Sequence, residues 1–236
     1  MKPPIRAILD RLAARYPEAA CGLRFADPFQ LLVATLLSAQ CTDARVNQVT
    51  ARLFARAAHP RALLELPPQE LEELLRPCGL HRTKAAHLRE ACRLLVEEHG
   101  GQVPETRREL ERLPGVGHKT AGVVLANAFH QPVLPVDTHI FRVSHRLGLS
   151  SAPDPERTQE DLEALVPPEE RVVAHHRFIA LGRELCTARR PRCSACPLAD
   201  LCPSAGLLSA EPGGTPGGGG IPTGNNGIPA GENEKS

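Results

Sequence analysis

The chain has 236 residues, 42% of them hydrophobic, which is enough to bury one large core or two smaller ones without disulfides. Its formal net charge is +1, so the overall charge does not by itself indicate a nucleic acid partner. The chain has no tryptophan and only one tyrosine, which argues against a nonspecific single-strand binder that stacks successive bases on aromatic rings.

No signal peptide or long apolar run is apparent in the sequence, and we expect a cytoplasmic protein with reduced thiols and no membrane segment. Residues 1–16 are amphipathic and bear arginines, and we interpret them as a first structural helix rather than a transit peptide. Four of the eight cysteines are scattered and are placed like small buried hydrophobic residues: Cys21, Cys41, Cys78 and Cys92.

Helix signals follow one another along the chain without a convincing pair of strands, so the sequence predicts an all-α protein. Asp27 and Pro28 are typical of the N-cap and first residue of a helix, and the apolar run at 29–37 indicates that this helix is buried. A second helix carries apolar residues at three- and four-residue steps and ends at a glycine pair: Ala85, Leu88, Cys92, Leu95 and Gly100-Gly101.

Thr106 and Glu109 form the pattern of a capping box before a short helix that ends near Leu113. Asp137 is well placed to cap a helix that runs to Gly148, and Pro167-Pro168 predict the start of a long helix that runs to about Cys186. From about residue 207 the composition changes to proline, glycine and asparagine, which predicts a disordered tail over 207–236.

Residues 113–119, with the sequence LPGVGHK, predict a tight glycine turn between two helices. We expect Gly115 and Gly117 to allow backbone conformations that a Cβ would block, leaving N–H groups exposed at the start of the second helix. Such a turn is able to bind a phosphate, although the two glycines alone are equally consistent with an ordinary helix connection.

Lys119 lies in the first turn of that second helix, where the positive end of the helix dipole disfavours the ammonium form. A free amine is a candidate nucleophile, and the alternative is a solvated surface lysine. Asp137 is expected to be an ionised N-cap that is also able to orient an amine or stabilise a developing cation.

Four cysteines lie within 17 residues in the pattern C-x6-C-x2-C-x5-C, which predicts a metal centre: Cys186, Cys193, Cys196 and Cys202. Zinc held by four thiolates is one alternative, although only one C-x2-C pair of the type common in zinc sites is present. The segment between the first two cysteines carries Arg189, Arg190 and Arg192, and a basic loop fixed at both ends favours contact with phosphate over a merely solvated loop.

Three motifs in this order, LPGVGHKTA at 113–121, VDTHIFRV at 136–143 and the cysteine spacing, resemble the endonuclease III family of DNA glycosylases in the helix-hairpin-helix superfamily. The resemblance covers about residues 1–206. It implies a bifunctional glycosylase and abasic-site lyase of base excision repair that acts on oxidised pyrimidines such as thymine glycol. It also implies that Lys119 attacks C1′ and forms a Schiff base, that Asp137 assists, and that the four cysteines hold a 4Fe-4S cluster.

The resemblance further implies that Gln40 fills the space left by an extruded base and that Leu80, in an exposed turn with His81, wedges into the opposite strand. Glu111 and His139 resemble pocket positions of the family. His118 departs from the family, which usually has arginine at this place, and this change puts the local phosphate contact or lysine activation in doubt.

We therefore expect a six-helix barrel with the helix-hairpin-helix at 21–131 and a cluster domain built from 1–20 and 132–206. A monomer at the nucleoid would bind double-stranded DNA with oxidised pyrimidines or abasic sites across the groove between them. A monofunctional adenine glycosylase is disfavoured, because Lys119 is present and residues 29–37 contain no acid. The remaining alternative is a noncatalytic helix-hairpin-helix DNA-binding protein with a redox-sensing cluster.

Overall fold

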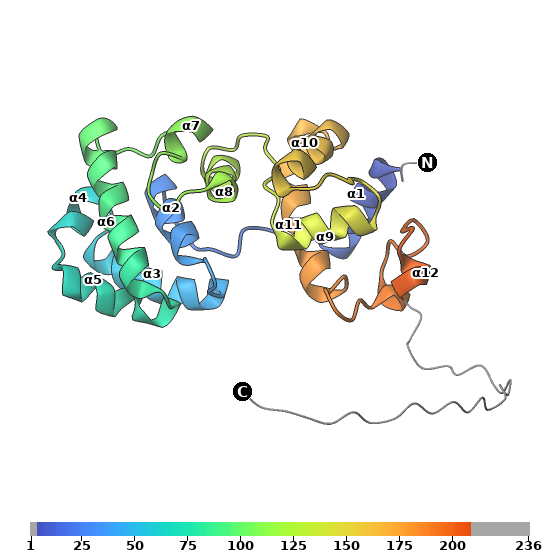
Figure 1. The fold of residues 1–236 in the computed structure, drawn as a ribbon, viewed down its shortest axis with the longest axis horizontal. Helices are drawn as coiled ribbons and strands as arrows, with labels where there is room; N and C mark the ends of the chain where they lie inside the picture. The colour runs from blue at the N-terminus through green and yellow to red at the C-terminus, as the bar shows by residue number, and fades with distance from the viewer. Residues whose placement is uncertain (1–3, 209–236) are drawn as a thin grey trace, which may run out of the picture.

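The computed structural model describes residues 4–208, and no strand occurs in that range, which confirms the all-α prediction. Its helices form two lobes that lie side by side along the long axis of the molecule (Figure 1). The first lobe contains α2 (Pro28–Leu37), α3 (Asp43–Arg56), α4 (Pro60–Glu65), α5 (Pro68–Leu75), α6 (His81–Glu98), α7 (Arg107–Leu110) and α8 (His118–Ala128). The second lobe contains α1 (Ile5–Arg15), α9 (Thr138–Arg146), α10 (Pro155–Leu165), α11 (Arg171–Glu184) and α12 (Ala205–Leu208). Single turns of 3-10 helix are η1 (Arg76–Cys78), η2 (Pro168–Glu170) and η3 (Cys193–Ala195).

The first lobe is built around α2, which is buried on most of its faces. Its start is the predicted one: Asp27 Oδ1 accepts a hydrogen bond from the Gln30 N–H at 2.9 Å, and Pro28 is the first helical residue. The helix packs against α3, α6 and α8. Because apolar residues surround α2 on several sides, it is a central helix of the kind that its continuous apolar sequence predicts.

The second lobe includes α1, which comes from the N-terminal end of the sequence and is separated from the other helices of this lobe by the whole first lobe. Ile8, Leu9 and Leu12 are buried in one core with residues of α9 and α11. Three ion pairs on the rim of this core join α1 to later segments: Arg6 to Glu170, Arg11 to Asp200 and Arg15 to Glu184. Residues 5–15 of the predicted amphipathic segment therefore form a structural helix, as the sequence predicts.

Two predicted helices end earlier than their sequences suggest. The Thr106 hydroxyl accepts a hydrogen bond from the Glu109 N–H at 3.3 Å, but it donates its own proton to the Glu109 carboxylate, which therefore does not reach the Thr106 N–H. The capping box is half formed. Helix α7 ends at Leu110 rather than near Leu113. The helix expected from Pro167 begins as the separate turn η2, and α11 ends at Glu184. Its end is set by Leu181, whose carbonyl accepts from both Leu185 and Cys186 N–H groups.

Other expectations are met in part. Cys78 and Cys92 are buried, whereas Cys21 and Cys41 are only half-buried and lie in the connections before and after α2. Residues 207 and 208, which the sequence places in the tail, belong to α12, and the rest of the predicted tail lies outside the described residues. Among residues 4–208, no helix combines the length and the apolar character needed to cross a bilayer.

The two glycines of the turn between α7 and α8 have different backbone conformations. Gly115 has φ +80°, and a Cβ built there would lie 3.0 Å from His87 Nδ1 and 3.1 Å from Leu36 Cδ2. Gly117, in contrast, has φ −94° and ψ −179°, an extended conformation open to any residue, with nothing within 4 Å of a built Cβ. The expectation that both glycines are required by the backbone is therefore correct for Gly115 and wrong for Gly117.

This difference predicts unequal effects on stability. Gly115→Ala should lower the free energy of unfolding by about 1–3 kcal/mol, because alanine would be strained at positive φ and crowded by two side chains. Gly117→Ala should lower it less, by no more than about 1 kcal/mol, because alanine fits this extended backbone but is a poorer residue than glycine at the N-cap of α8. Urea unfolding of the two variants beside the wild-type protein measures both values, and equal losses would contradict this account of the turn.

Candidate active site between the two lobes

A cavity of about 270 Å³ lies where the two lobes meet, and both predicted catalytic residues line it. Lys119 comes from the first turn of α8 in the first lobe, and Asp137 from the N-cap of α9 in the second. Further lining residues come from the chain after α1, from the end of α2, from the start of α3 and from α11: Cys21, Thr35, Ser38, Asp43, His175, His176 and Arg183. Two helix starts that are separate in sequence therefore face one space.

The two helix starts differ in how their backbone N–H groups are satisfied. Asp137 Oδ1 accepts hydrogen bonds from the N–H groups of His139 at 2.8 Å and Ile140 at 2.9 Å, which confirms its predicted N-cap role. The N-cap of α8 is Gly117, which has no side chain to do the same. The start of α8 thus offers N–H groups and an exposed lysine to a ligand.

Close packing between α8 and the chain that precedes α9 holds the two helix starts together. A Cβ on Gly122 of α8 would lie 2.9 Å from Pro135 Cγ, so only glycine lets the chain before α9 pass this near to α8. From the other side, the Nδ1 atom of His175 is 2.7 Å from the Pro135 carbonyl oxygen. His176 Nε2 is 2.8 Å from Asn127 Oδ1, which links α11 to α8.

The histidine pair of α11 is a feature that our sequence analysis missed. Burial lowers the pKa of His175 to about 3, with neighbouring His176 adding to the effect. Burial also lowers the pKa of His176 to about 4, and the Lys119 ammonium adds to it. Both rings are therefore neutral at neutral pH and form an uncharged wall beside Lys119. Two adjacent histidines in one predicted helix were the available signal.

Asp43 and Arg183 were also missed, and they form an ion pair across the cavity with a distance of 3.1 Å from Arg183 Nη1 to Asp43 Oδ2. Asp43 begins α3 and Arg183 lies near the end of α11, so the pair bridges the two lobes. Nothing in the local sequence pairs these residues, because they are brought together only by the docking of the lobes.

The two residues predicted to enter the duplex share an unusual backbone conformation. Gln40 has φ +56° and Leu80 has φ +47°, both in the left-handed region that non-glycine residues rarely adopt. Both are exposed, and the Leu80 exposed fraction of 59% is large for an apolar side chain. His81, directly after Leu80, is the first residue of α6 and is half-buried. The structure thus places strained residues in both loops.

The remaining predicted pocket residues have other partners. His139 Nδ1 is 3.2 Å from an Arg142 guanidinium nitrogen, and its Cβ packs against Gly182 of α11. Glu111 lies 3.1 Å from His118 Nδ1, which joins the residue before Lys119 to the helix-hairpin-helix turn. Neither Glu111 nor His139 is among the described residues that line the cavity of Lys119 and Asp137.

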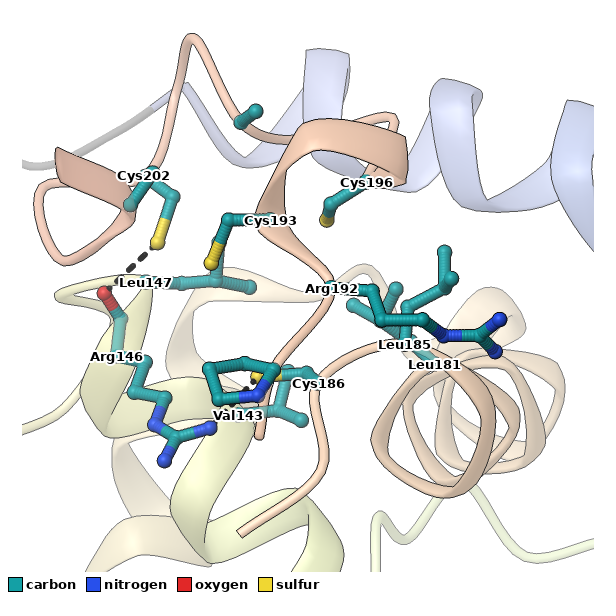
Figure 2. A pocket seen from close by; sticks show the side chains of 13 residues that line it. Val143, Arg146, Leu147, Leu181, Leu185, Cys186, Arg192, Cys193, Cys196 and Cys202 are labelled. Carbon is teal, nitrogen blue, oxygen red and sulfur yellow. Dashed lines mark hydrogen bonds between the residues drawn. The ribbon is translucent and has the colours of Figure 1, made fainter. Parts of the chain in front are cut away.

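The four clustered cysteines line a second cavity, between the 186–202 segment and helices α9 and α11 (Figure 2). Within residues 4–208, no three histidine, cysteine or acidic side chains are close enough to share a single ion, so the thiols stand apart around this cavity. Burial raises the pKa values of the Cys196 and Cys202 thiols, and the neighbouring cysteines add to both shifts. Four soft sulfur ligands around one apolar space fit an iron-sulfur cluster.

The basic loop that begins at Cys186 is held from α9 as well as by its cysteines. Arg142 Nε donates to the Cys186 carbonyl at 3.0 Å, and Arg146 donates to the carbonyls of Thr187 at 2.7 Å and Ala188 at 2.9 Å. Within the loop, Arg189, Arg190 and Arg192 are all exposed, and Arg192 also donates to the Glu184 carbonyl at 2.6 Å. The loop thus has a defined conformation with three exposed arginines.

Comparisons with known proteins agree with this architecture. Residues 33–168 match the family described as HhH-GPD superfamily base excision DNA repair protein, and residues 186–202 match the iron-sulfur binding domain of endonuclease III. Endonuclease III of Escherichia coli strain K12 is 47% identical over 195 residues, which cover 83% of this chain and 92% of that protein. Endonuclease III of a Synechocystis strain is 50% identical over 199 residues, 84% of this chain and 91% of its own length.

Solved structures show the same relationship. A trapped covalent intermediate of endonuclease III with DNA superposes with a TM-score of 0.82 at 45% identity, covering 86% of this chain and 96% of that one. A thermostable thymine-DNA glycosylase, at 23% identity and a TM-score of 0.79, shares the fold. With both lobes, the helix-hairpin-helix and the cysteine segment all matched, the chain belongs to the endonuclease III family of base excision repair enzymes, DNA glycosylases with abasic-site lyase activity that bind DNA and an iron-sulfur cluster.

Proposed function

We propose that this enzyme removes oxidised pyrimidines such as thymine glycol from double-stranded DNA and cleaves the strand at the resulting abasic site, with Lys119 as the nucleophile. The observation that carries the proposal is that Lys119 and Asp137 line one cavity between the lobes. Residues 4–208 contain only one other lysine, Lys84, which is buried with its ammonium bonded to three carbonyls. Lys119 is therefore the described lysine amine that a substrate is able to reach.

The chemistry assigns a separate task to each residue. The Lys119 amine attacks C1′ of the damaged nucleotide, the bond from C1′ to the base breaks, and the base leaves with the bonding electrons. Asp137, whose side chain is oriented by hydrogen bonds from two backbone N–H groups, accepts the proton of the attacking amine or stabilises positive charge on the sugar. The C1′–O4′ bond of the sugar ring then breaks, with its electrons going to O4′, and the Schiff base forms between C1′ and the lysine nitrogen. The Schiff base acidifies C2′, and loss of a C2′ proton breaks the C3′–O bond, so that the 3′ phosphate leaves.

The proposal also includes how DNA is held and opened. The start of α8, with the turn at Gly115 and Gly117, binds backbone phosphate, and the exposed Arg189 and Arg190 extend this basic surface from the second lobe. Arg192 also supports the loop conformation through the Glu184 carbonyl. Gln40 fills the space of the extruded base, and Leu80 enters the opposite strand. We further propose that the enzyme acts as a monomer at the nucleoid.

For the metal site, we propose that Cys186, Cys193, Cys196 and Cys202 hold a 4Fe-4S cluster. Support comes from four thiols around one cavity and from arginine donors nearby, with Arg146 Nη1 at 3.4 Å from Cys186 Sγ. The cluster lies in the second lobe apart from the cavity of Lys119, and its expected task is to keep the basic loop in shape.

Lys119→Gln should abolish borohydride-trapped complexes and strand cleavage on duplex DNA that contains thymine glycol, because the amide has no nucleophilic amine. Binding of the lesion duplex should remain, since the remaining contacts are unchanged. Lys119→Arg is the matched control: it keeps the positive charge and should be equally inactive. Borohydride trapping by either variant at the wild-type level would show that another residue is the nucleophile. A wild-type protein that binds the lesion duplex but is not trapped on it would favour the noncatalytic alternative.

Asp137→Asn should keep the α9 cap, because asparagine caps about as well as aspartate, but it should slow single-turnover cleavage by removing the charge. Asp137→Ala should add a loss of about 0.5–2 kcal/mol in the free energy of unfolding. Asp27→Ala, which removes the equivalent cap of α2, serves as the control and should lose stability without the rate defect. Cleavage by the asparagine variant at the wild-type rate would leave Asp137 as a cap only.

Anaerobically purified protein should contain about four irons per chain and absorb broadly in the visible range, as a 4Fe-4S cluster requires. Cys193→Ala should lose iron, whereas Cys92→Ala, which changes a fully buried cysteine of α6, should retain it. Iron, sulfide and zinc contents are measured for the wild-type protein and for the two variants. Stoichiometric zinc without iron in the wild-type protein would exclude this cluster.

A further inference from the structure

Lys84 is a buried cation that the proposed chemistry does not use. It lies in the first turn of α6 with an exposed fraction of only 8%, and within residues 4–208 it forms no ion pair. Its Nζ donates instead to three backbone carbonyls: those of Leu37 at 2.9 Å, Ala39 at 2.8 Å and Cys78 at 2.9 Å. An ammonium has three N–H donors, so each of them is matched to one acceptor.

The three carbonyls belong to the ends of two elements that are far apart in the sequence. Leu37 is the last residue of α2 and Ala39 lies just beyond it, whereas Cys78 is the last residue of η1. Carbonyls at helix ends have no partner within the helix, and a cation is favoured beside them. The Lys84 backbone N–H also bonds the Leu80 carbonyl at 2.9 Å, so one residue holds both loops.

These two loops carry the strained residues. Described residues other than glycine with positive φ are Gln40, Leu80 and His130. Gln40 lies directly after Ala39, and Leu80 lies two residues after Cys78, so both are next to or near carbonyls that the Lys84 ammonium binds. A left-handed conformation at such residues costs free energy and persists only where the surrounding structure holds it, a situation common at functional sites. Here the surrounding structure includes a single ammonium that faces both loops.

We propose that Lys84 is a positioning residue that fixes the Gln40 loop and the Leu80 loop relative to each other, so that both side chains enter the duplex as one unit. This inference rests on the proposed roles of Gln40 and Leu80. Neither side chain touches Lys84 in the contacts described; the coupling passes through the backbone carbonyls. Removal of the ammonium would leave three carbonyls without their donor and would release the two loops from each other.

The test uses Lys84→Met, which keeps the length of the side chain and removes its donors. Arg89→Met is the matched control, because Arg89 lies on the same helix and also donates to backbone carbonyls, those of Leu66 at 2.8 Å and Leu64 at 3.2 Å. Those carbonyls border α4 and lie outside the two strained loops. Both variants should lose stability, but only Lys84→Met should affect opening of DNA.

Two reactions are measured at a temperature where thermal melts show each variant to be folded. The first is opening and base release on a duplex that carries thymine glycol beside 2-aminopurine, whose fluorescence reports unstacking. The second is cleavage of a single-stranded oligonucleotide with a preformed abasic site, which requires no extrusion of a base. Lys84→Met should slow the first reaction by about tenfold or more, the factor expected for loss of a charged hydrogen bond, and leave the second unchanged. Arg89→Met should match the wild-type enzyme in both.

Lys84→Arg is a second variant, which keeps a buried cation in case Lys84→Met fails to fold. The planar guanidinium group of arginine cannot donate to the three carbonyls in the geometry of the lysine ammonium. Duplex opening by Lys84→Arg should therefore also be slowed, with cleavage of the single strand unchanged. Equal loss of both reactions in the Lys84 variants, or wild-type opening by both of them, would overturn the positioning role. A wild-type enzyme that cleaves abasic single strands but leaves thymine glycol in place would instead overturn the proposed substrate.

Discussion

The active site depends on the contact between α8 and the chain that leads into α9. A Cβ on Gly122 would lie 2.9 Å from Pro135, so the two segments approach as closely as they do because one of them has no side chain at this point. The His175 ring, bonded to the Pro135 carbonyl, holds the same segment from the side of α11. This contact brings an uncapped helix start that carries Lys119 to the same cavity as a capped helix start that carries Asp137.

Helix α9 connects this cavity to the cysteine segment. Its N-cap, Asp137, faces the cavity, and the side chains of Arg142 and Arg146 further along the helix donate to carbonyls at the start of the basic loop. A short helix is rigid over this length, so the proposed catalytic carboxylate and the loop that is proposed to meet phosphate keep a fixed relative position. The cluster, through the cysteines at both ends of that loop, would complete the same support.

Several cations of this protein bind its own backbone carbonyls and carboxylates. Lys84, Arg142 and Arg146 each donate to two or more backbone carbonyls, and these carbonyls lie mostly at the ends of helices, where they lack partners within the helix. Three arginines of α1 are committed to ion pairs with the second lobe. The formal net charge of +1 therefore says little about the surface that meets DNA, because internal and external cations contribute to it equally.

The sequence by itself determined the all-α class, several helices with their caps and the candidate active residues, because these depend on local signals: Asp27 before Pro28, Asp137 before α9, and cysteines at fixed spacing. It also indicated the family, since three motifs occur in one order. Local signals did not separate Gly115 from Gly117, which differ in φ. Glu111 and His139 were assigned to a pocket only by the resemblance to the family, and neither lines the cavity of Lys119 and Asp137. The histidine pair, the Asp43–Arg183 ion pair and the three bonds of Lys84 were decided by tertiary structure alone, because each joins segments whose proximity exists only after helices and lobes have packed.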